Sequence, residues 1–263
     1  MRKSSFVLTA SDHGTMIVNR NDYQEVNDGG YGIGYQLLNK SNFDLDEVKI
    51  ALKLLDTRKS LYGKDILALD CGANIGVHTI EWAKHMLGWG NVISFEPQER
   101  IFYALCGNIV LNNCSNARAV KAAIGEKPGK INVPVLDYDV VSSFGSLELK
   151  KDKGNEYIGQ EVDYNPQKGI MTELLSIDSL KLKNVHFLKI DIEGMEIQAI
   201  KGAKTTISKF KPILMIEKIK SDQAYLKSML EQLGYKVQEM NLNFLATHKD
   251  DPITSTLKIH KTR

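Results

Sequence analysis

Cysteine is scarce in this chain, which has three among 263 residues. Cys71, Cys106 and Cys114 form no C-x-x-C pair and leave an odd thiol, a pattern that argues against a disulfide framework. Long apolar runs are absent too. No run approaches the roughly 18 residues of a membrane-spanning helix, and the first residues hold no apolar core of signal-peptide length. These absences predict a cytoplasmic protein in a reducing compartment, with no membrane partner.

An excess of one charge is also missing. The 34 basic and 32 acidic residues give a formal net charge of +2. Binding to nucleic acid or to anionic lipid through a broad charged surface needs a marked excess of basic residues, so we expect no nucleic-acid partner. The length suits one large α/β domain, or such a core with an N-terminal extension. An oligomer is compatible with these numbers, and nothing in the sequence specifies one.

Two phosphate-binding patterns are missing as well. G-x-x-x-x-G-K-[ST] occurs nowhere, and Asn74 stands where the middle glycine of G-x-G-x-x-G is often found. The chain has instead an apolar run at 66–69, typical of a strand buried on both faces, and an amphipathic helix pattern at 79–87. Between them Gly72 and Gly76 allow a tight turn and a close approach of the backbone to a ligand. A strand, a glycine turn and a helix in this order predict a nucleoside-binding crevice at the carboxyl edge of a sheet.

Asp70, at the end of that first strand, indicates which nucleoside binds. Dinucleotide sites place a pyrophosphate at the helix N-terminus, and a carboxylate at this position would repel it. The same carboxylate attracts the ammonium and sulfonium groups of S-adenosyl-L-methionine. We therefore predict this molecule as the cofactor. The turn residues expected in its pocket are Gly72, Ala73, Asn74 and Gly76. A nicotinamide-dependent oxidoreductase, which uses a similar sheet, is the alternative.

A second acid follows the next strand. Glu96 comes after the apolar run 91–95 and before Pro97, and it follows Asp70 by 96 − 70 = 26 residues. An acid at about this interval binds the ribose hydroxyls in such folds, so we assign Glu96 and Pro97 to the cofactor site. The alternative is a surface acid that favours a helix N-terminus. His78 could face the cofactor or an acceptor, although a helical histidine with a satisfied hydrogen bond is commoner.

The order of elements predicts the fold class. Residues 1–60 are expected to form an accessory or lid segment, with a glycine-rich loop at 22–35 and a helix that opens on a capping box at 44–47. Residues 61–263 are expected to form the S-adenosylmethionine-binding domain, an α/β, doubly wound, mostly parallel seven-stranded sheet of Rossmann-like type that ends in an antiparallel hairpin. The later strands are expected at 118–124, 186–191, 212–217, 235–240 and 243–247. Ser221 is expected to cap the last helix.

One interval, 125–182, interrupts the alternation of strands and helices with scattered glycines and prolines. A long irregular insertion in a compact domain is more often functional than accidental. We expect this one to hang over the carboxyl edge of the sheet and to face the substrate. A surface loop or an oligomer contact is the alternative.

Residues 189–196 are the candidate catalytic segment. Lys189 lies in an apolar strand and needs a partner there, for which Asp191 and Glu217 are the candidates. Asp191 and Glu217 end neighbouring strands, and adjacent carboxylates raise one pKa toward the range that a general base requires. We predict Asp191 as that base, with Glu193 orienting the acceptor or the cofactor amine. The competing interpretation is that Glu193 and Glu196 are helix-start acids and that Lys189 and Glu217 form a structural ion pair. The three acids could hold magnesium or calcium, but they lack a clear ligand spacing and we expect no metal.

Taken together, these segments resemble the FkbM family of S-adenosylmethionine-dependent methyltransferases. The matching stretches are D-C-G-A-N-I-G (70–76), F-E-P (95–97), A-I-G (123–125), S-I-D-S-L (176–180), K-I-D-I-E-G-M-E (189–196), K-G-A (201–203) and I-E (216–217). The resemblance implies a class I methyltransferase fold and transfer of a methyl group to a hydroxyl of a small molecule or saccharide. It also implies that Asp70, Gly72 and Glu96 are cofactor residues. A non-catalytic protein that keeps only the S-adenosylmethionine pocket is the remaining alternative.

Overall fold

A seven-stranded sheet forms the centre of the computed structural model, which describes residues 4–26 and 29–255. The strands lie in the order β13-β14-β12-β11-β5-β6-β7. Their bounds are β5 (Ile66–Cys71), β6 (Gly90–Phe95), β7 (Ala117–Val120), β11 (Phe187–Ile190), β12 (Ile213–Glu217), β13 (Tyr235–Met240) and β14 (Asn243–His248). The first five of these are parallel, whereas β14 runs antiparallel to both β12 and β13. The doubly wound sheet and its terminal hairpin confirm the predicted fold class.

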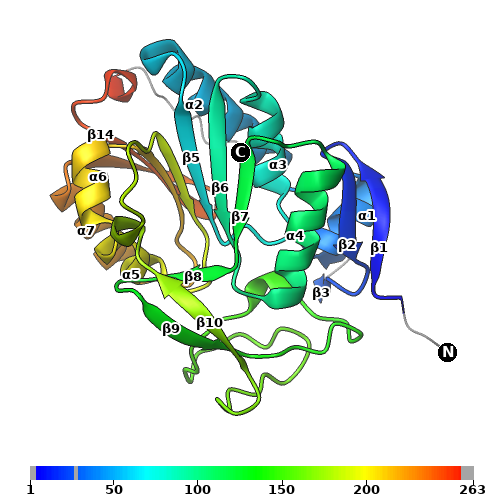
Figure 1. Ribbon diagram of the computed structural model, residues 1–263. Helices are drawn as coiled ribbons and strands as arrows, with labels where there is room; N and C mark the ends of the chain where they lie inside the picture. The colour runs from blue at the N-terminus through cyan, green and yellow to red at the C-terminus, as the bar shows by residue number, and fades with distance from the viewer. Residues whose placement is uncertain (1–3, 27–28, 256–263) are drawn as a thin grey trace.

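Helices cover both faces of this sheet (Figure 1). One apolar core lies against α2 (Leu45–Tyr62), α3 (Val77–His85) and α4 (Glu99–Leu111). The other lies against α5 (Glu196–Lys201), α6 (Lys204–Phe210) and α7 (Gln223–Gln232). Both faces of the central strands are therefore buried, which explains their nearly continuous apolar sequences. No helix among residues 4–26 and 29–255 combines the length and the apolarity needed to cross a membrane.

Strand periodicity decides where the polar residues go. In β5, Ile66 and Ala68 pack into the α2–α3 core, while Leu69 and Cys71 pack into the α5–α7 core. Because side chains alternate between faces, Asp70 belongs to the α2–α3 face. The same alternation applies to the other strand ends. It places Glu96, Asp191, Glu217 and Asn243 on this one face, at one edge of the sheet.

The N-terminal region is more regular than its glycine content predicts. A hairpin of β1 (Phe6–Ser11) and β2 (Gly14–Asn19) packs on α4, and a small hairpin of β3 (Gln24–Val26) and β4 (Gly29–Tyr31) precedes α1 (Ile33–Lys40). The expected loop at 22–35 is therefore wrong over the part that the structure describes, and residues 27–28 lie outside it. The glycines serve close packing instead. A Cβ on Gly34 would lie 2.1 Å from the carbonyl oxygen of Asn19.

Two helix caps and one strand also differ from the prediction. Asp44 makes no side-chain capping bond at α2, because its backbone is left-handed there. Asp222, rather than Ser221, caps α7 by accepting a hydrogen bond from the Tyr225 amide. The expected strand at 118–124 breaks at Lys121. The chain continues as β8 (Ala122–Ile124), which leaves the main sheet and joins a second one.

That second sheet anchors the insertion. It has the order β8-β10-β9, with β9 (Gly129–Val133) and β10 (Ile170–Leu175) contributed by the insertion itself. The insertion thus contains regular structure that its scattered glycines concealed. Between these strands, the segment 134–169 runs below the main sheet (Figure 1) and includes the 3₁₀ helix η1 (Phe144–Ser146).

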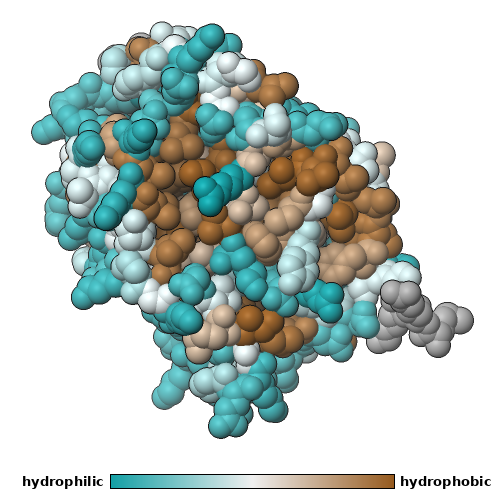
Figure 2. Space-filling model, viewed as in Figure 1, coloured by the Kyte–Doolittle hydropathy of each residue, from teal (hydrophilic) through white to brown (hydrophobic). Residues whose placement is uncertain are grey.

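Apolar surface gathers over α4 and the β1–β2 hairpin (Figure 2). Val110 of α4 and Leu8 of β1 are 74% and 64% exposed. Neither residue lines the pocket described next, so this surface is separate from the candidate site.

Candidate functional site

A pocket opens at the carboxyl edge of the sheet, where β5 has β6 on one side and β11 on the other. After β7 the chain crosses back over β5, so the helices that follow these strands lie on opposite faces and leave a crevice between them. The predicted residues that line this pocket are Asp70, Gly72, Ala73, Asn74, His78, Glu96, Pro97, Lys189, Asp191, Glu193 and Glu217. Of the predicted site residues, Gly76 alone is absent from its lining.

The two turn glycines are required by the chain itself. Gly72 has φ +82°, and a Cβ there would lie 1.7 Å from the carbonyl oxygen of Asp191. Gly76 has φ +95°, and its Cβ would lie 2.5 Å from Cδ1 of Leu105. The sequence correctly indicated a tight turn, and it predicted a close approach of the backbone to a ligand. At both glycines, however, the close neighbour is another part of the protein, and at Gly72 it is the start of the candidate catalytic loop.

Asp70 presents one uncommitted oxygen at the pocket. The side chain is fully buried, and its Oδ2 accepts a hydrogen bond of 2.7 Å from the Thr79 hydroxyl. Its Oδ1 is buried and has no hydrogen-bond partner among the described residues. A buried carboxylate oxygen left without a donor is costly, so this atom suits a positively charged or hydrogen-bond-donating ligand.

Glu96 is fixed by the turn that it faces. Its two carboxylate oxygens accept hydrogen bonds from the backbone amides of Asn74, at 3.0 Å, and Gln98, at 2.8 Å. Burial raises the pKa of Glu96 to about 7, against the lowering effect of these two amides. Each oxygen keeps a further lone pair for a ligand hydroxyl.

His78 and Glu47 connect α3 to α2 across the pocket. His78 Nε2 lies 3.2 Å from Glu47 Oε1, and the Asn243 amide donates to Glu47 Oε2 at 2.7 Å. Although burial acts to raise it, the hydrogen bond and charge of His78 hold the pKa of Glu47 at about 2. The sequence assigned Glu47 to a helix cap. Its partner His78, which comes 31 residues later, could not be inferred from local spacing.

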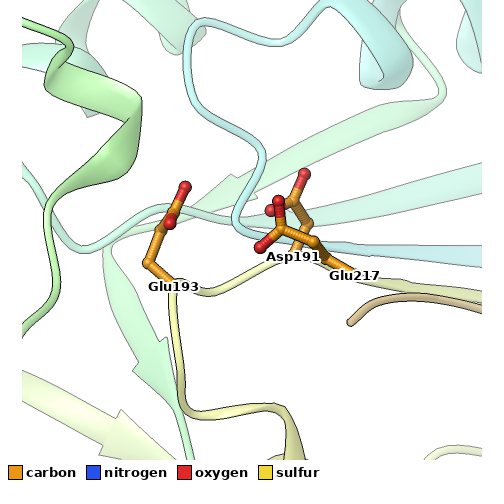
Figure 3. Close-up of side chains that lie close together, drawn as sticks. All are labelled: Asp191, Glu193 and Glu217. Carbon is orange, nitrogen blue, oxygen red and sulfur yellow. The ribbon is translucent and has the colours of Figure 1, made fainter. Parts of the chain in front are cut away.

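Three carboxylates meet beside this group. Oxygen atoms of Asp191, Glu193 and Glu217 all lie within 4.8 Å of one another. Figure 3 shows the carboxylates of Asp191 and Glu217 side by side, with that of Glu193 across a gap from them. Burial and the charge of Asp191 raise the pKa of Glu193 to about 8. Burial and the charges of Asp191 and Glu193 raise that of Glu217 to about 10.

Two lysines accompany these acids. Lys189 Nζ donates a 2.7 Å hydrogen bond to Asp191 Oδ2, which confirms the first of its two predicted partners. Burial acts to lower the pKa of Lys189, but the charges of Asp191 and Glu47 outweigh it and raise that pKa. Lys220 Nζ lies 2.8 Å from Glu193 Oε2 and also donates to the Ser146 carbonyl, so it connects the loop to the insertion.

The loop that carries Glu193 is held by Glu196. Oε1 of Glu196 accepts hydrogen bonds from the amides of Ile192 and Gly194, and its Oε2 accepts one from the Ser221 hydroxyl. Glu193 itself has φ +55°, a left-handed conformation that costs free energy for a residue other than glycine. Glu196, first seen as a helix-start acid, therefore shapes the loop that presents Glu193.

Comparison with known proteins bears on this arrangement. A model of the Methyltransferase FkbM domain matches residues 70–237, which is well over half of the chain. This chain belongs to the FkbM methyltransferase family. The match runs from Asp70 through residues 189–196 and Glu217 into β13, so it includes the elements that form the carboxyl edge of the sheet.

Individual relatives of this FkbM methyltransferase are distant. Methyltransferase 1 of Beauveria bassiana (strain ARSEF 2860) is 26% identical over 188 residues, 66% of this chain and 73% of that protein. The crystal structure of a methyltransferase FkbM from Methylobacillus flagellatus has 19% identity and a TM-score of 0.47, and the match covers 70% of this chain and 44% of that one. Precorrin-6y C5,15-methyltransferase from Geobacter metallireducens has 12% identity and a TM-score of 0.43, and the match covers 76% of this chain and 86% of that one. This chain thus spans less than half the length of the Methylobacillus protein.

Two walls of the pocket in this FkbM methyltransferase come from segments without a sequence motif. Tyr31, Gly32 and Ile33 contribute one, and residues 143–149 of the insertion contribute the other. Asp22 joins them, because its carboxylate accepts hydrogen bonds from the amides of Gly34 and Phe144. Asp22 stood only at the edge of the expected glycine loop, and its partner 122 residues away gave no local signal.

Proposed function

We propose that this FkbM methyltransferase uses S-adenosyl-L-methionine to methylate a hydroxyl group of a small molecule or saccharide. The observation that carries the proposal is the buried, uncommitted Oδ1 of Asp70 at the pocket. It places a negative charge where a dinucleotide would bind through its pyrophosphate, and that charge would repel the pyrophosphate. The ammonium and sulfonium of S-adenosyl-L-methionine match that charge.

The residues around the glycine turn suit this cofactor. Asp70 Oδ1 would accept a hydrogen bond from the methionine ammonium, and Glu96 would accept hydrogen bonds from the ribose hydroxyls. Ala73, Asn74 and Pro97 would line the adenosine part of the pocket, with Gly72 and Gly76 setting the turn. When bound, S-adenosyl-L-methionine supplies an electrophilic methyl group carried on sulfur.

The chain's own residues have to orient the acceptor and take its proton. Asp191 is the proposed proton acceptor, because Lys189 holds Oδ2 and leaves Oδ1 for the acceptor hydroxyl. Lys189 fixes the rotamer of Asp191, and Glu193, which Lys220 orients, would position the acceptor from across the gap. His78 would contribute to the same wall through its contact with Glu47.

We also propose that residues 1–60 and the insertion at 125–182 close the acceptor side of the pocket. Their contribution of Tyr31 and of residues 143–149 to the lining supports this. The Asp22 hydrogen bonds to Gly34 and Phe144 keep the two segments together. Exclusion of water by such walls strengthens electrostatic interactions within a site.

The variant Asp191→Asn tests the catalytic assignment. It keeps the size of the side chain and removes the proton acceptor, so we expect methyl transfer to fall by about 100-fold or more while S-adenosylhomocysteine still binds. Acceptors can be found by incubating the protein with methyl-labelled cofactor and separate small-molecule, polysaccharide and RNA fractions. Asp163→Asn, which alters an exposed acid of the insertion, is the matched control and should leave transfer unchanged.

Three results would contradict the proposal. Binding of NADH with no binding of S-adenosylhomocysteine would indicate an oxidoreductase. Cofactor binding with no label in any fraction would indicate a binding protein without chemistry. Label in the RNA fraction, with substrate binding that weakens steeply as salt rises, would indicate a nucleic-acid acceptor.

A further inference from the structure

The carboxyl groups of Asp191, Glu193 and Glu217 form a set of oxygen donors at one edge of the pocket. Lys189 pairs with Asp191 and Lys220 pairs with Glu193. Glu217 has no ion pair among the described residues. A carboxylate in a buried position is normally paired, hydrogen-bonded or bound to a metal. Glu217 is therefore the member of the cluster that requires explanation.

A second observation concerns the unsatisfied oxygens next to the cluster. Glu217 is 9% exposed, and its Oε2 has no hydrogen-bond partner among the residues that the structure describes. Asn243 lies opposite Glu217 in the β12–β14 ladder and is 4% exposed, and its Oδ1 also lacks a partner within that part of the chain. The Asn243 amide nitrogen faces the Glu47 carboxylate, which fixes Oδ1 as the free atom.

We propose that Asp191, Glu193 and Glu217 bind a divalent cation that prefers oxygen ligands, with Asn243 next to Glu217 on the neighbouring strand. This inference rests on the proposed function, because the cation would lie in the same pocket as the acceptor. The expectation from sequence was that no metal binds, because spacing alone gave no ligand pattern. The pattern arises only in the fold, where strand ends and a loop bring the acids together.

The spacing of the oxygens is compatible with a divalent cation held by oxygen ligands. Calcium–oxygen distances of about 2.3–2.6 Å place opposite ligands about 4.6–5.2 Å apart, whereas the shorter bonds of magnesium place them about 4.1 Å apart. The oxygens of the cluster lie within 4.8 Å of one another, so the three acids can ligate one ion of calcium size together. Lys189 and Lys220 would then hold the ligating carboxylates from outside, as second-sphere groups commonly do.

The cation would leave room for substrate. Three carboxylate ligands occupy half or fewer of the six to eight positions of such an ion, and the rest would be filled by water or by oxygen atoms of the acceptor. The pocket lining includes all three acids, so those positions would open toward the acceptor side. The acceptor class this selects is a molecule that presents a hydroxyl with a neighbouring oxygen.

Direct ion binding tests the inference. After treatment with EDTA and its removal, Mn²⁺ binding is measured by electron paramagnetic resonance and Ca²⁺ binding by calorimetry. We expect about one ion per chain, and we expect Glu217→Gln and Asp191→Asn each to weaken binding at least about tenfold. Glu173→Gln, which removes an exposed acid outside the pocket, is the matched control and should bind as the unaltered protein does.

Two outcomes would overturn the cation site: no saturable Mn²⁺ or Ca²⁺ binding at millimolar concentration, or binding that neither cluster variant weakens. S-adenosylhomocysteine binding, measured on the same metal-free samples, confirms that each variant is folded. It also separates the two proposals. Cofactor binding without ion binding would refute the cation site alone, whereas loss of cofactor binding from the unaltered protein would refute the proposed function.

Discussion

The charge of Asp70 can be removed with little change of shape. Asp70→Asn keeps a side-chain oxygen that accepts the 2.7 Å hydrogen bond from Thr79, and it replaces the free Oδ1 with an uncharged group. The fold should tolerate this, because a buried carboxylate oxygen without a hydrogen-bond donor is itself unfavourable. The change therefore isolates the electrostatic contribution of one atom to cofactor binding.

The expected loss follows from the type of contact. A hydrogen bond to a charged group in a buried site contributes about 1.5–3 kcal/mol, which corresponds to about a 10- to 150-fold change in affinity. We expect the Kd for S-adenosylhomocysteine, measured by isothermal titration calorimetry, to rise by that factor. Urea unfolding of the same variant should show a free energy of unfolding within about 1 kcal/mol of the unaltered protein.

Thr79→Val is the companion variant, because it removes the hydroxyl that holds Asp70 but leaves the carboxylate charge. It should weaken cofactor binding less than Asp70→Asn does. If Asp70→Asn bound the cofactor within twofold of the unaltered protein, the electrostatic account of cofactor choice would be wrong. An equal loss in both variants would show that geometry matters rather than charge.

Two further predictions concern stability. Gly72→Ala should lower the free energy of unfolding by more than about 2 kcal/mol in urea, because its Cβ would meet the Asp191 carbonyl oxygen. Gly88→Ala, with φ +83° and open space around it, should cost only about 1 kcal/mol, and equal costs would contradict the packing argument. Burial raises the pKa of Asp22 from 3.8 to about 6 against the lowering effect of the Gly34 and Phe144 amides, so its proton stabilises the fold below about pH 4 and that stability is lost as the pH rises through 6. Relative to Asp22→Asn, the unaltered protein should lose up to about 3 kcal/mol between pH 4 and pH 7, and parallel unfolding curves for the two proteins would refute this.

Strand ends were the most predictable part of the site. Apolar runs that stop at an acid located Asp70, Glu96, Asp191 and Glu217, because a strand buried on both faces has to be apolar until it reaches the edge. The order of strands and helices then implied that these ends share one edge of a parallel sheet. The Lys189–Asp191 pair followed from the cost of an unpaired lysine in such a strand.

Local sequence patterns predicted the wrong helix caps where a side chain forms its hydrogen bonds with a distant segment instead. The 44–47 pattern resembles a capping box, but Glu47 turns to His78 and Asn243 instead. Ser221 resembles a helix cap, but it donates to Glu196. In both cases a buried partner from another element competes with the helix end, and the sequence near the cap does not contain that partner.

The sequence by itself determined the doubly wound sheet, the glycine turn and the acids that end its strands, because burial and periodicity act over a few residues. Only the tertiary structure decided which of those acids meet. It brought Asp191, Glu193 and Glu217 within one cluster, placed Asn243 beside Glu217, and joined the N-terminal segment to the insertion through Asp22. The physical reason is that charge and hydrogen bonding act between atoms that are close in space, and residues up to 122 positions apart become close only when the chain has folded.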